Sequence, residues 1–232
     1  DGITVNGAVA LGPLVTHRRL ATDPAIRARC PALAEAAATV GGWQTQEVGT
    51  IGGNVCNASP AADTAPPLLA AGAVFHLAGS SGRRSVGGEE FFIDRRTTAR
   101  RPDELLVGIE VPGMPPTTGE VYLKLGRRGA MEVAIVGLAV RITLDPEGTV
   151  ERARIAVCSV APRPFRATEA EAVLQGSRLE DDVVASAGAA LRGAATPIDD
   201  ARATAAYRRR VLPGMLARAV AECHRRAIGV RS

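Results

Sequence analysis

A proline- and glycine-rich segment in the middle of the chain, Gly113-Met114-Pro115-Pro116-Thr117-Thr118-Gly119, separates two kinds of sequence pattern. Short apolar runs mixed with alanine-rich stretches precede it, and long alternating runs followed by helical periodicity come after it. Proline interrupts both helices and central strands, so this composition predicts a linker. Because 232 residues suffice for two modest domains, we predict a first domain over residues 1–113 and a second over residues 119–228.

The first part of the chain mixes strands and helices. Strands are expected at 3–11 (a hairpin at Asn6-Gly7), 73–77, 83–86 and 104–111. Helices are expected from Thr16 to Leu20, from Asp23-Pro24 onward and over residues 31–40. Residues 43–66 are interpreted as loops with one short helical start, and residues 94–101 as an exposed arginine-rich loop.

The second part has a simpler order. Three strands are expected at residues 121–125, 134–144 and 150–160, followed by three helices at residues 166–175, 181–193 and 204–227. The predicted fold class is therefore α+β, with a small antiparallel sheet and three helices in the second domain.

The segment from Thr50 to Asp63, T-I-G-G-N-V-C-N-A-S-P-A-A-D, is the richest in chemistry. Gly52 and Gly53 permit positive φ and let backbone N–H groups approach a ligand. Ser59-Pro60 is typical of a helix N-cap, and a helix N-terminus attracts anions. The pattern suits a phosphorylated cofactor, and a tight surface corner is the alternative. Neither a P-loop nor a Rossmann fingerprint is present.

Several function classes find no support in the sequence. The four cysteines, at 30, 56, 158 and 223, never form C-x-x-C, and the three histidines form no H-x-x-x-H pair, so we predict no iron–sulfur or metal site. No G-x-S-x-G motif suggests a catalytic nucleophile. With no apolar run of about 20 residues and no secretory signal, the sparse cysteines indicate reduced thiols in the cytoplasm.

The charge balance is unusual because Lys124 is the only lysine in a chain of net charge +4. Repeated arginine pairs leave an arginine-rich nucleic-acid-binding protein as an alternative function. Aromatic residues, which stack on bases, are only 3% of the chain, so we predict no nucleic-acid partner.

The segment at 50–63 resembles the second FAD-binding segment of the molybdopterin dehydrogenase flavoproteins, the medium subunits of xanthine dehydrogenase-like and carbon monoxide dehydrogenase-like enzymes. Further segments resemble the same family in the same order, across nearly the whole chain. They are Gly12–His17, Glu104–Pro112, Tyr122–Met131, Val160–Pro164 and Tyr207–Arg209.

This resemblance implies a PCMH-type FAD-binding domain, here partial, that carries electrons and has no catalytic side chain of its own. Molybdopterin and [2Fe–2S] clusters would lie on a large and a small partner subunit, and FAD here would pass electrons to an external acceptor. The implied cofactor-binding residues are Thr50, Ile51, Gly52, Gly53, Asn54, Asp63, Leu106 and Lys124. Val40 and Val133 fall where the family places further cofactor neighbours.

The sequence departs from the family pattern in one respect. Family members carry an earlier glycine-rich FAD loop, roughly A-G-G-x-S, in a subdomain that precedes the point where this chain begins. The expectation is that these residues alone bind FAD weakly or not at all. A related alternative is an interaction subunit of the same complex that no longer binds flavin.

Overall fold

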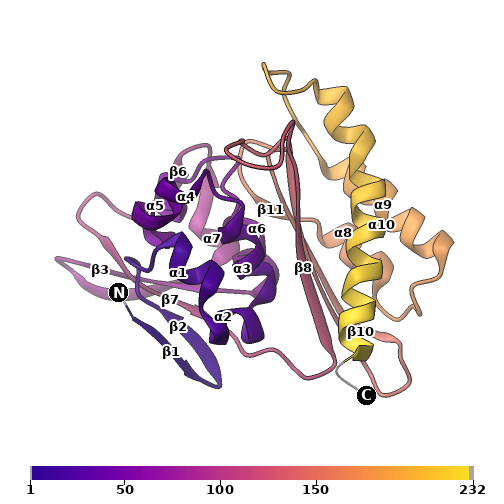
Figure 1. The fold of residues 1–232 in the computed structure, drawn as a ribbon, viewed down its shortest axis with the longest axis horizontal. Coiled ribbons are helices and arrows are strands. Elements are labelled where there is room, and N and C mark those ends of the chain that lie inside the picture. Colours follow the sequence, from indigo (N-terminus) through magenta and orange to yellow (C-terminus); the bar gives the residue numbers. More distant parts are fainter. Residues whose placement is uncertain (1, 230–232) are drawn as a thin grey trace.

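The computed structural model describes residues 2–229. Figure 1 shows the first half of the chain, drawn in indigo to magenta, lying beside a second sheet whose far face carries the long C-terminal helices. The linker between Val111 and Thr118 connects the two parts, as the proline and glycine content predicts. The predicted α+β fold class is confirmed.

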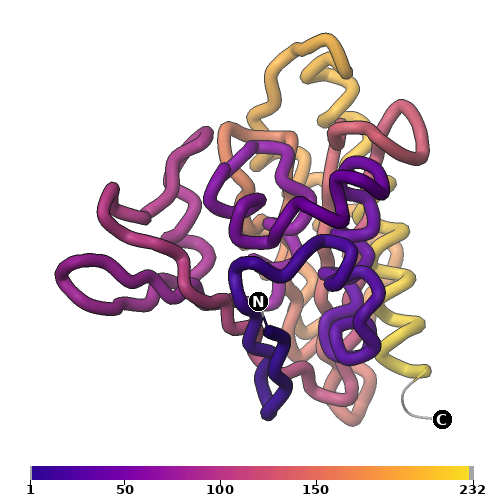
Figure 2. The backbone as a smooth tube through the Cα atoms, turned by 60° about the vertical axis from the view of Figure 1, so that its left-hand side comes forward, coloured from indigo at the N-terminus to yellow at the C-terminus, as the bar shows by residue number. Residues whose placement is uncertain are grey.

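The first domain contains a five-stranded antiparallel sheet with the order β1-β2-β7-β3-β4. The strands are β1 (Ile3–Asn6), β2 (Ala8–Leu11), β3 (Val74–Gly79), β4 (Gly82–Gly87) and β7 (Leu105–Val111). Gly7 turns the first hairpin at φ 75°, where glycine carries no Cβ penalty. Both predicted hairpins are confirmed. Figure 2 shows β3 and β4 projecting to one side of the molecule.

Between β2 and β3 the chain forms six helices. They are α1 (His17–Thr22), α2 (Pro24–Arg29), α3 (Pro31–Ala38), α4 (Trp43–Val48), α5 (Ile51–Asn57) and α6 (Ala65–Ala71). Thr16 accepts a hydrogen bond from the Arg19 backbone, and Asp23 accepts one from Ala25, so both predicted N-caps are confirmed.

The loop interpretation of residues 43–66 is wrong, because α4, α5 and the first residues of α6 occupy most of this segment. Ser59 does not cap a helix either; its hydroxyl accepts from the Ala61 backbone at 3.2 Å in a turn, and α6 begins only at Ala65. The glycines of α5 and the prolines of α6 hid these two helices, since both residues have low helix propensity, and α4 is only six residues long.

The arginine-rich segment near residue 94 also holds more structure than predicted. After the single turn α7 (Gly88–Phe91), β5 (Phe92–Asp94) and β6 (Thr97–Thr98) form a small hairpin. Phe75, Phe91 and Phe92 pack beneath it, with Phe75 and Phe91 stacked at a centroid distance of 4.1 Å. These rings lock the hairpin onto the first-domain core.

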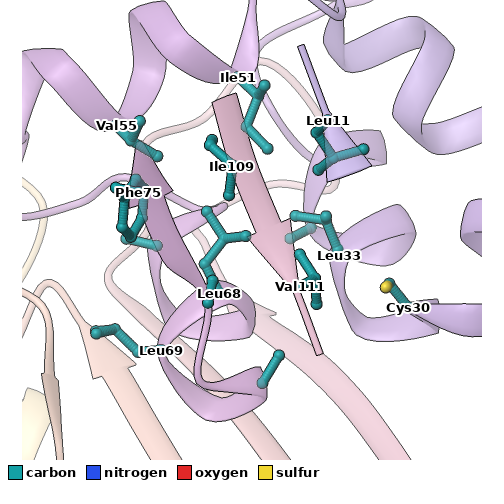
Figure 3. Packing of buried hydrophobic residues seen from close by; sticks show 14 of the residues in the cluster. Leu11, Cys30, Leu33, Ile51, Val55, Leu68, Leu69, Phe75, Ile109 and Val111 are labelled. Carbon is teal, nitrogen blue, oxygen red and sulfur yellow. The ribbon is translucent and has the colours of Figure 1, made fainter. Parts of the chain in front are cut away.

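The first-domain core fills the space between the sheet and its helices. Figure 3 shows Leu33 and Leu68 from the helices meeting Ile109 and Val111 of β7. Ile51 of α5 is fully buried in the same cluster. Its burial fixes the start of α5, which belongs to the segment predicted to bind a cofactor, on the core.

The second domain is a four-stranded antiparallel sheet with the order β11-β10-β9-β8. Its strands are β8 (Thr118–Leu125), β9 (Val136–Leu144), β10 (Val150–Cys158) and β11 (Phe165–Arg166). Its helices are α8 (Thr168–Leu174), α9 (Asp181–Ala194) and α10 (Ala205–Gly229). The three predicted long strands and three helices are confirmed.

The second sheet is covered on both faces. The helices α8, α9 and α10 pack on one face (Figure 1), while α3 and α6 of the first domain pack against β8, β9 and β10 on the other. Every residue of β9 is buried for this reason. Thr39, just beyond α3, and Asp63, between α5 and α6, are thereby brought against β8.

Candidate functional site

The start of α5 carries the first group of predicted site residues. Thr50 is its N-cap, and the Thr50 hydroxyl accepts a hydrogen bond from the Gly53 backbone at 3.0 Å. A short bridge between Thr16 and Thr50 anchors this turn to the N-terminal region, with the Ile51 backbone donating to Val15 O at 2.9 Å. The turn is therefore held rigidly from both sides.

The two glycines serve a different purpose from the one predicted. Neither has a positive φ, because both lie in the first turn of α5. A Cβ on Gly52 would approach the Pro13 carbonyl oxygen to 2.6 Å, so glycine is needed there for close packing. Gly53 is exposed, and a Cβ on it would meet only the Thr50 hydroxyl, at 3.1 Å.

The backbone N–H groups of this turn already have hydrogen-bond partners within the protein. The N–H groups of Gly52 and Asn54 donate to Pro13 O and Thr50 O, at 2.9 and 3.0 Å, and Gly53 is capped by Thr50. A phosphate would therefore reach the turn through the bare Cα face of Gly53 and compete with the Thr50 hydroxyl. The uncovered face and the polar groups around it fit a phosphorylated cofactor.

Asn54 links this turn to the next part of the site. Its side-chain oxygen accepts a hydrogen bond from the Thr64 hydroxyl at 2.7 Å. Thr64 is fully buried and directly follows Asp63 in the chain. The two ends of the predicted FAD segment are therefore joined by a side-chain contact.

Asp63 lies at the junction of the two domains, where it is 6% exposed. Lys124 of β8 donates to one carboxylate oxygen at 2.9 Å, and the Tyr122 hydroxyl donates to the other at 2.6 Å. Lys124 also donates to the Thr39 carbonyl at 2.8 Å, beyond the end of α3. One lysine therefore connects α3, the FAD segment and the second sheet.

Burial sets the electrostatics of this junction. It raises the pKa of Asp63, while the Lys124 charge and the Tyr122 hydroxyl act in the opposite direction. Burial also raises the pKa of Tyr122 well above its usual value, so the phenol stays neutral and acts as a donor. A buried lysine–carboxylate pair costs desolvation, and such pairs are often kept for function rather than stability.

The remaining predicted positions lie in three different places. Leu106 is buried in the first-domain core, and Val40 is buried just beyond α3. Val133 is 48% exposed and lines a cavity of about 380 Å³ beside Ser59, Pro60 and Ala61. The structure thus brings Asp63 and Lys124 together and links Asn54 to them through Thr64, but it does not bring Leu106 to them.

That cavity contains polar groups without partners. Arg208 is 2% exposed, and it donates to the carbonyls of Ile135 and Ser159 and to Asp200. Its Nε and the Ser159 hydroxyl have no hydrogen-bond partner among the described residues, although both are buried. Buried polar atoms are normally satisfied, so these two are exceptions among the described residues.

Two residues of the site escaped the sequence analysis. Tyr122 stands two positions before Lys124, so the two side chains share one face of β8. Because alternate residues of a strand point to the same side, the sequence could have predicted that Tyr122 lies beside Lys124. Arg208 lies within a segment that resembles the family, but only the fold shows its burial beside the cavity.

The described residues contain no group of three or more His, Cys, Asp or Glu side chains able to hold a metal ion. Within the same part of the chain, no helix is both long and apolar enough to cross a membrane. All four cysteines are free thiols.

Comparison with protein families gives two matches. Residues 3–114 match the FAD binding domain in molybdopterin dehydrogenase, and residues 121–223 match the CO dehydrogenase flavoprotein C-terminal domain. Similar proteins include the 6-hydroxypseudooxynicotine dehydrogenase complex subunit alpha of Paenarthrobacter nicotinovorans, 34% identical over 94% of this chain and 74% of the relative. The carbon monoxide dehydrogenase medium chain of Hydrogenophaga pseudoflava is 33% identical, over 94% of this chain and 76% of the relative.

Solved structures agree with these matches. A chain of the carbon monoxide dehydrogenase from Hydrogenophaga pseudoflava that lacks the Mo-pyranopterin moiety superposes with a TM-score of 0.93 and 34% identity, covering 97% of this chain and 78% of that one. Quinoline 2-oxidoreductase from Pseudomonas putida 86 gives a TM-score of 0.90 at 25% identity, covering 98% of this chain and 79% of that one.

The two matched domains define an oxidoreductase flavoprotein with FAD as its cofactor. More narrowly, the chain belongs to the family of FAD-binding medium subunits of molybdenum hydroxylases, in which the molybdenum and iron–sulfur cofactors are held by partner subunits. The expected family, fold class and cofactor are confirmed. The individual site residues and the domain boundaries stay predictions.

Proposed function

We propose that this chain is the electron-transfer subunit of a cytoplasmic molybdenum hydroxylase complex. It would take electrons from the iron–sulfur clusters of a small subunit, after substrate oxidation at a molybdenum cofactor in a large subunit, and pass them to an external acceptor. The observation that carries the proposal is the buried Asp63–Lys124 pair at 2.9 Å, which stands directly behind the FAD segment.

Some residues of this chain would bind FAD, and others would stabilise the charge of its reduced ring. Thr50, Gly53 and Asn54 would hold the phosphates and the ribityl chain, because they present small polar groups and an uncovered glycine face. FAD supplies the redox chemistry when bound, by accepting and releasing electrons on its ring. Lys124 would stabilise negative charge on the reduced ring, and Asp63 would fix the position of that ammonium group.

The acceptor needs a route to the flavin. The cavity of about 380 Å³ beside Ser59–Ala61 adjoins the FAD segment and is lined in part by Arg208. Arg95 and Arg96 also line it. These features favour this cavity as the place where an external acceptor approaches, and they suit an acceptor with negatively charged groups.

The proposal is tested by replacing Asp63 with asparagine, which keeps the shape of the side chain and removes its charge. FAD content per chain and FAD affinity are measured in the purified complex. We expect FAD affinity to fall roughly tenfold or more, as when a charge-assisted hydrogen bond is lost. Asp103→Asn is the matched control, because Asp103 is exposed and bonds only to Ser80 in the first domain. Equal FAD retention in both variants would contradict the assignment of Asp63.

A flavin-free interaction subunit remains the second candidate. The N–H groups of Gly52 and Asn54 are already satisfied within the protein, which leaves fewer free donors for a pyrophosphate than the sequence suggests. The absorbance spectrum of the purified native complex separates the two functions, because a flavin band stoichiometric with this chain requires the cofactor to be bound.

The nucleic-acid alternative loses support from the arginine pairing. Several members of the arginine pairs are neutralised by ion pairs: Arg84 with Glu104, Arg127 and Arg128 with Glu132, and Arg225 and Arg226 with Glu222. A nucleic-acid-binding protein would show affinity that falls steeply with salt. We expect no such salt-dependent binding.

A further inference from the structure

Two arginines on the second sheet face each other without an intervening acid. Arg154 of β10 pairs directly with Arg141 of β9 across the strands, and Arg152 pairs with Thr143. Because side chains two positions apart share a face of a strand, Arg152 and Arg154 project to the same side. Like charges placed opposite one another across strands destabilise a sheet.

Among the described residues, only one of these three arginines, Arg141, has an ion pair with an acid. Glu120 lies opposite Arg141 on β8, and its carboxylate stands 3.8 Å from Arg141 Nε. Arg141 also donates to the Gly113 carbonyl at 3.2 Å. Within the described part of the chain, neither Arg152 nor Arg154 has an ion pair or a side-chain hydrogen bond. Glu151 is exposed at the edge of the same group.

Arg154 suffers most from this arrangement. It is partly buried against the end of α6, where a Cβ on Gly72 would collide with its guanidinium. Burial lowers the pKa of Arg154, and the positive charges of Arg166, Arg152 and Arg141 lower it further. Glu171, which is bound to Arg166 together with Glu89, acts in the opposite direction and offsets only part of this repulsion on Arg154.

The three guanidinium groups surround a cavity between the two domains. Its volume is about 240 Å³, and water needs only roughly 10–15 Å³ of such space per molecule. Gly72 at the end of α6 and Pro112, Gly113 and Pro115 of the linker form the opposite wall. The space therefore lies between the two domains, is lined by the three arginines as well as by Glu151, and is large enough for a small hydrated anion.

We propose that this cavity is a binding site for a tetrahedral oxyanion of the phosphate type. The arginine guanidinium is a planar fork of N–H donors that pairs with two oxygens of such an anion at once. Arg152 and Arg154 are the principal ligands, and Arg141 completes the site from β9. The anion neutralises the cross-strand repulsion and ties the linker to the second sheet. The site is separate from the FAD segment.

The test uses the full chain and inorganic phosphate. Thermal unfolding is measured in sodium phosphate and in sodium chloride at equal ionic strength and pH, and phosphate binding is titrated by calorimetry. The wild-type chain is expected to unfold at a higher temperature in phosphate. The double variant Arg152→Gln, Arg154→Gln is expected to bind phosphate roughly tenfold more weakly or worse and to lose the stabilisation.

Three control measurements separate phosphate binding at this site from other effects. Arg83→Gln removes an exposed arginine of β4 and should keep the full phosphate effect. Without phosphate, Arg154→Gln should unfold no earlier than the wild type, because it relieves repulsion, so its loss of phosphate binding cannot be ascribed to misfolding. Replacing phosphate by a phosphomonoester such as glycerol phosphate tells whether the site takes the free anion only or also an esterified phosphoryl group.

An equal stabilisation of the wild type and of the double variant by phosphate would place the bound anion elsewhere, for example at the FAD segment, and would overturn the proposal. So would identical unfolding of the wild type in phosphate and in chloride.

Discussion

Asp63 and His17 are two buried polar side chains that the protein treats differently. Asp63 keeps two strong donors, the Tyr122 hydroxyl and the Lys124 ammonium group, which offset the cost of burying its charge. The His17 side chain is almost fully buried against Gly49, and its Nδ1 has no partner among the described residues. Burial lowers the pKa of His17 to about 4, so this ring stays neutral.

This difference predicts a loss of stability in mild acid. Above pH 6.5 His17 is neutral in both states and contributes nothing. As the pH falls from 6.5 toward 4, the unfolded chain takes up a proton that the folded chain does not, so the free energy of unfolding decreases. The full effect of this pKa difference is about 3 kcal/mol.

The measurement is denaturant unfolding between pH 7 and pH 4. We expect His17→Gln to show a shallower pH dependence than the wild type. His224→Gln, on the partly exposed surface of α10, is the control and should follow the wild-type curve. Parallel curves for all three proteins would rule out His17 as the source.

The sequence singled out two residues that the structure brings into contact, although their role in binding the cofactor stays a prediction. Lys124 stood out as the only lysine of the chain, and the structure places it on Asp63, another predicted residue. The sequence carries no information on the third partner, Thr39, because a backbone carbonyl contributes regardless of the side chain. Cross-domain contacts of this kind depend on packing rather than on local pattern.

At the scale of the element, α5 shows why glycines are hard to interpret. The pair Gly52-Gly53 predicts a turn with positive φ, yet both residues begin a helix. The reason for Gly52 is its contact with Pro13, which lies far away in the sequence. The strands, by contrast, were predicted well, because alternation and the turn at Asn6-Gly7 are local properties.

The two glycines should therefore respond differently to alanine. Gly52→Ala forces a methyl group into the Pro13 carbonyl, so we expect a loss of roughly 1–3 kcal/mol in the free energy of unfolding. Gly53→Ala meets only the Thr50 hydroxyl and raises helix propensity, so stability should be unchanged or higher. Its methyl group would instead cover the face offered to the cofactor and weaken FAD binding.

Chemical denaturation and FAD titration of the two variants, side by side, check this prediction. The same stability loss in both would mean that the exposed face of Gly53 is packed in solution. Unchanged FAD affinity in Gly53→Ala would remove this turn from the cofactor site.

At the scale of the whole molecule, the linker composition predicts two domains but not how closely they are joined. The core of the first domain includes Tyr122, Ala139 and Ala156 from the second sheet. Glu35 of α3 accepts a hydrogen bond from the Tyr122 backbone at 2.8 Å and pairs with Arg226 of α10 at 2.7 Å. The sequence could not show these contacts between the domains. It identifies residues 31–40 as an alanine-rich helix, but nothing in the sequence indicates which element packs against its buried face.

Because the cores share residues, we expect the two domains to unfold as one cooperative unit. Leu191 is fully buried in the second-domain core, so Leu191→Ala should cost roughly 2–5 kcal/mol. Trp43, the only tryptophan, lies on α4 of the first domain and reports on that domain alone. The midpoint seen by Trp43 fluorescence should fall together with the midpoint seen by far-UV circular dichroism.

Ile228→Ala, at a position 44% exposed on α10, should leave both midpoints nearly unchanged. If Leu191→Ala lowered the circular-dichroism midpoint but left the Trp43 midpoint in place, the domains would unfold independently, and the Asp63–Lys124 junction would be a contact between separable units.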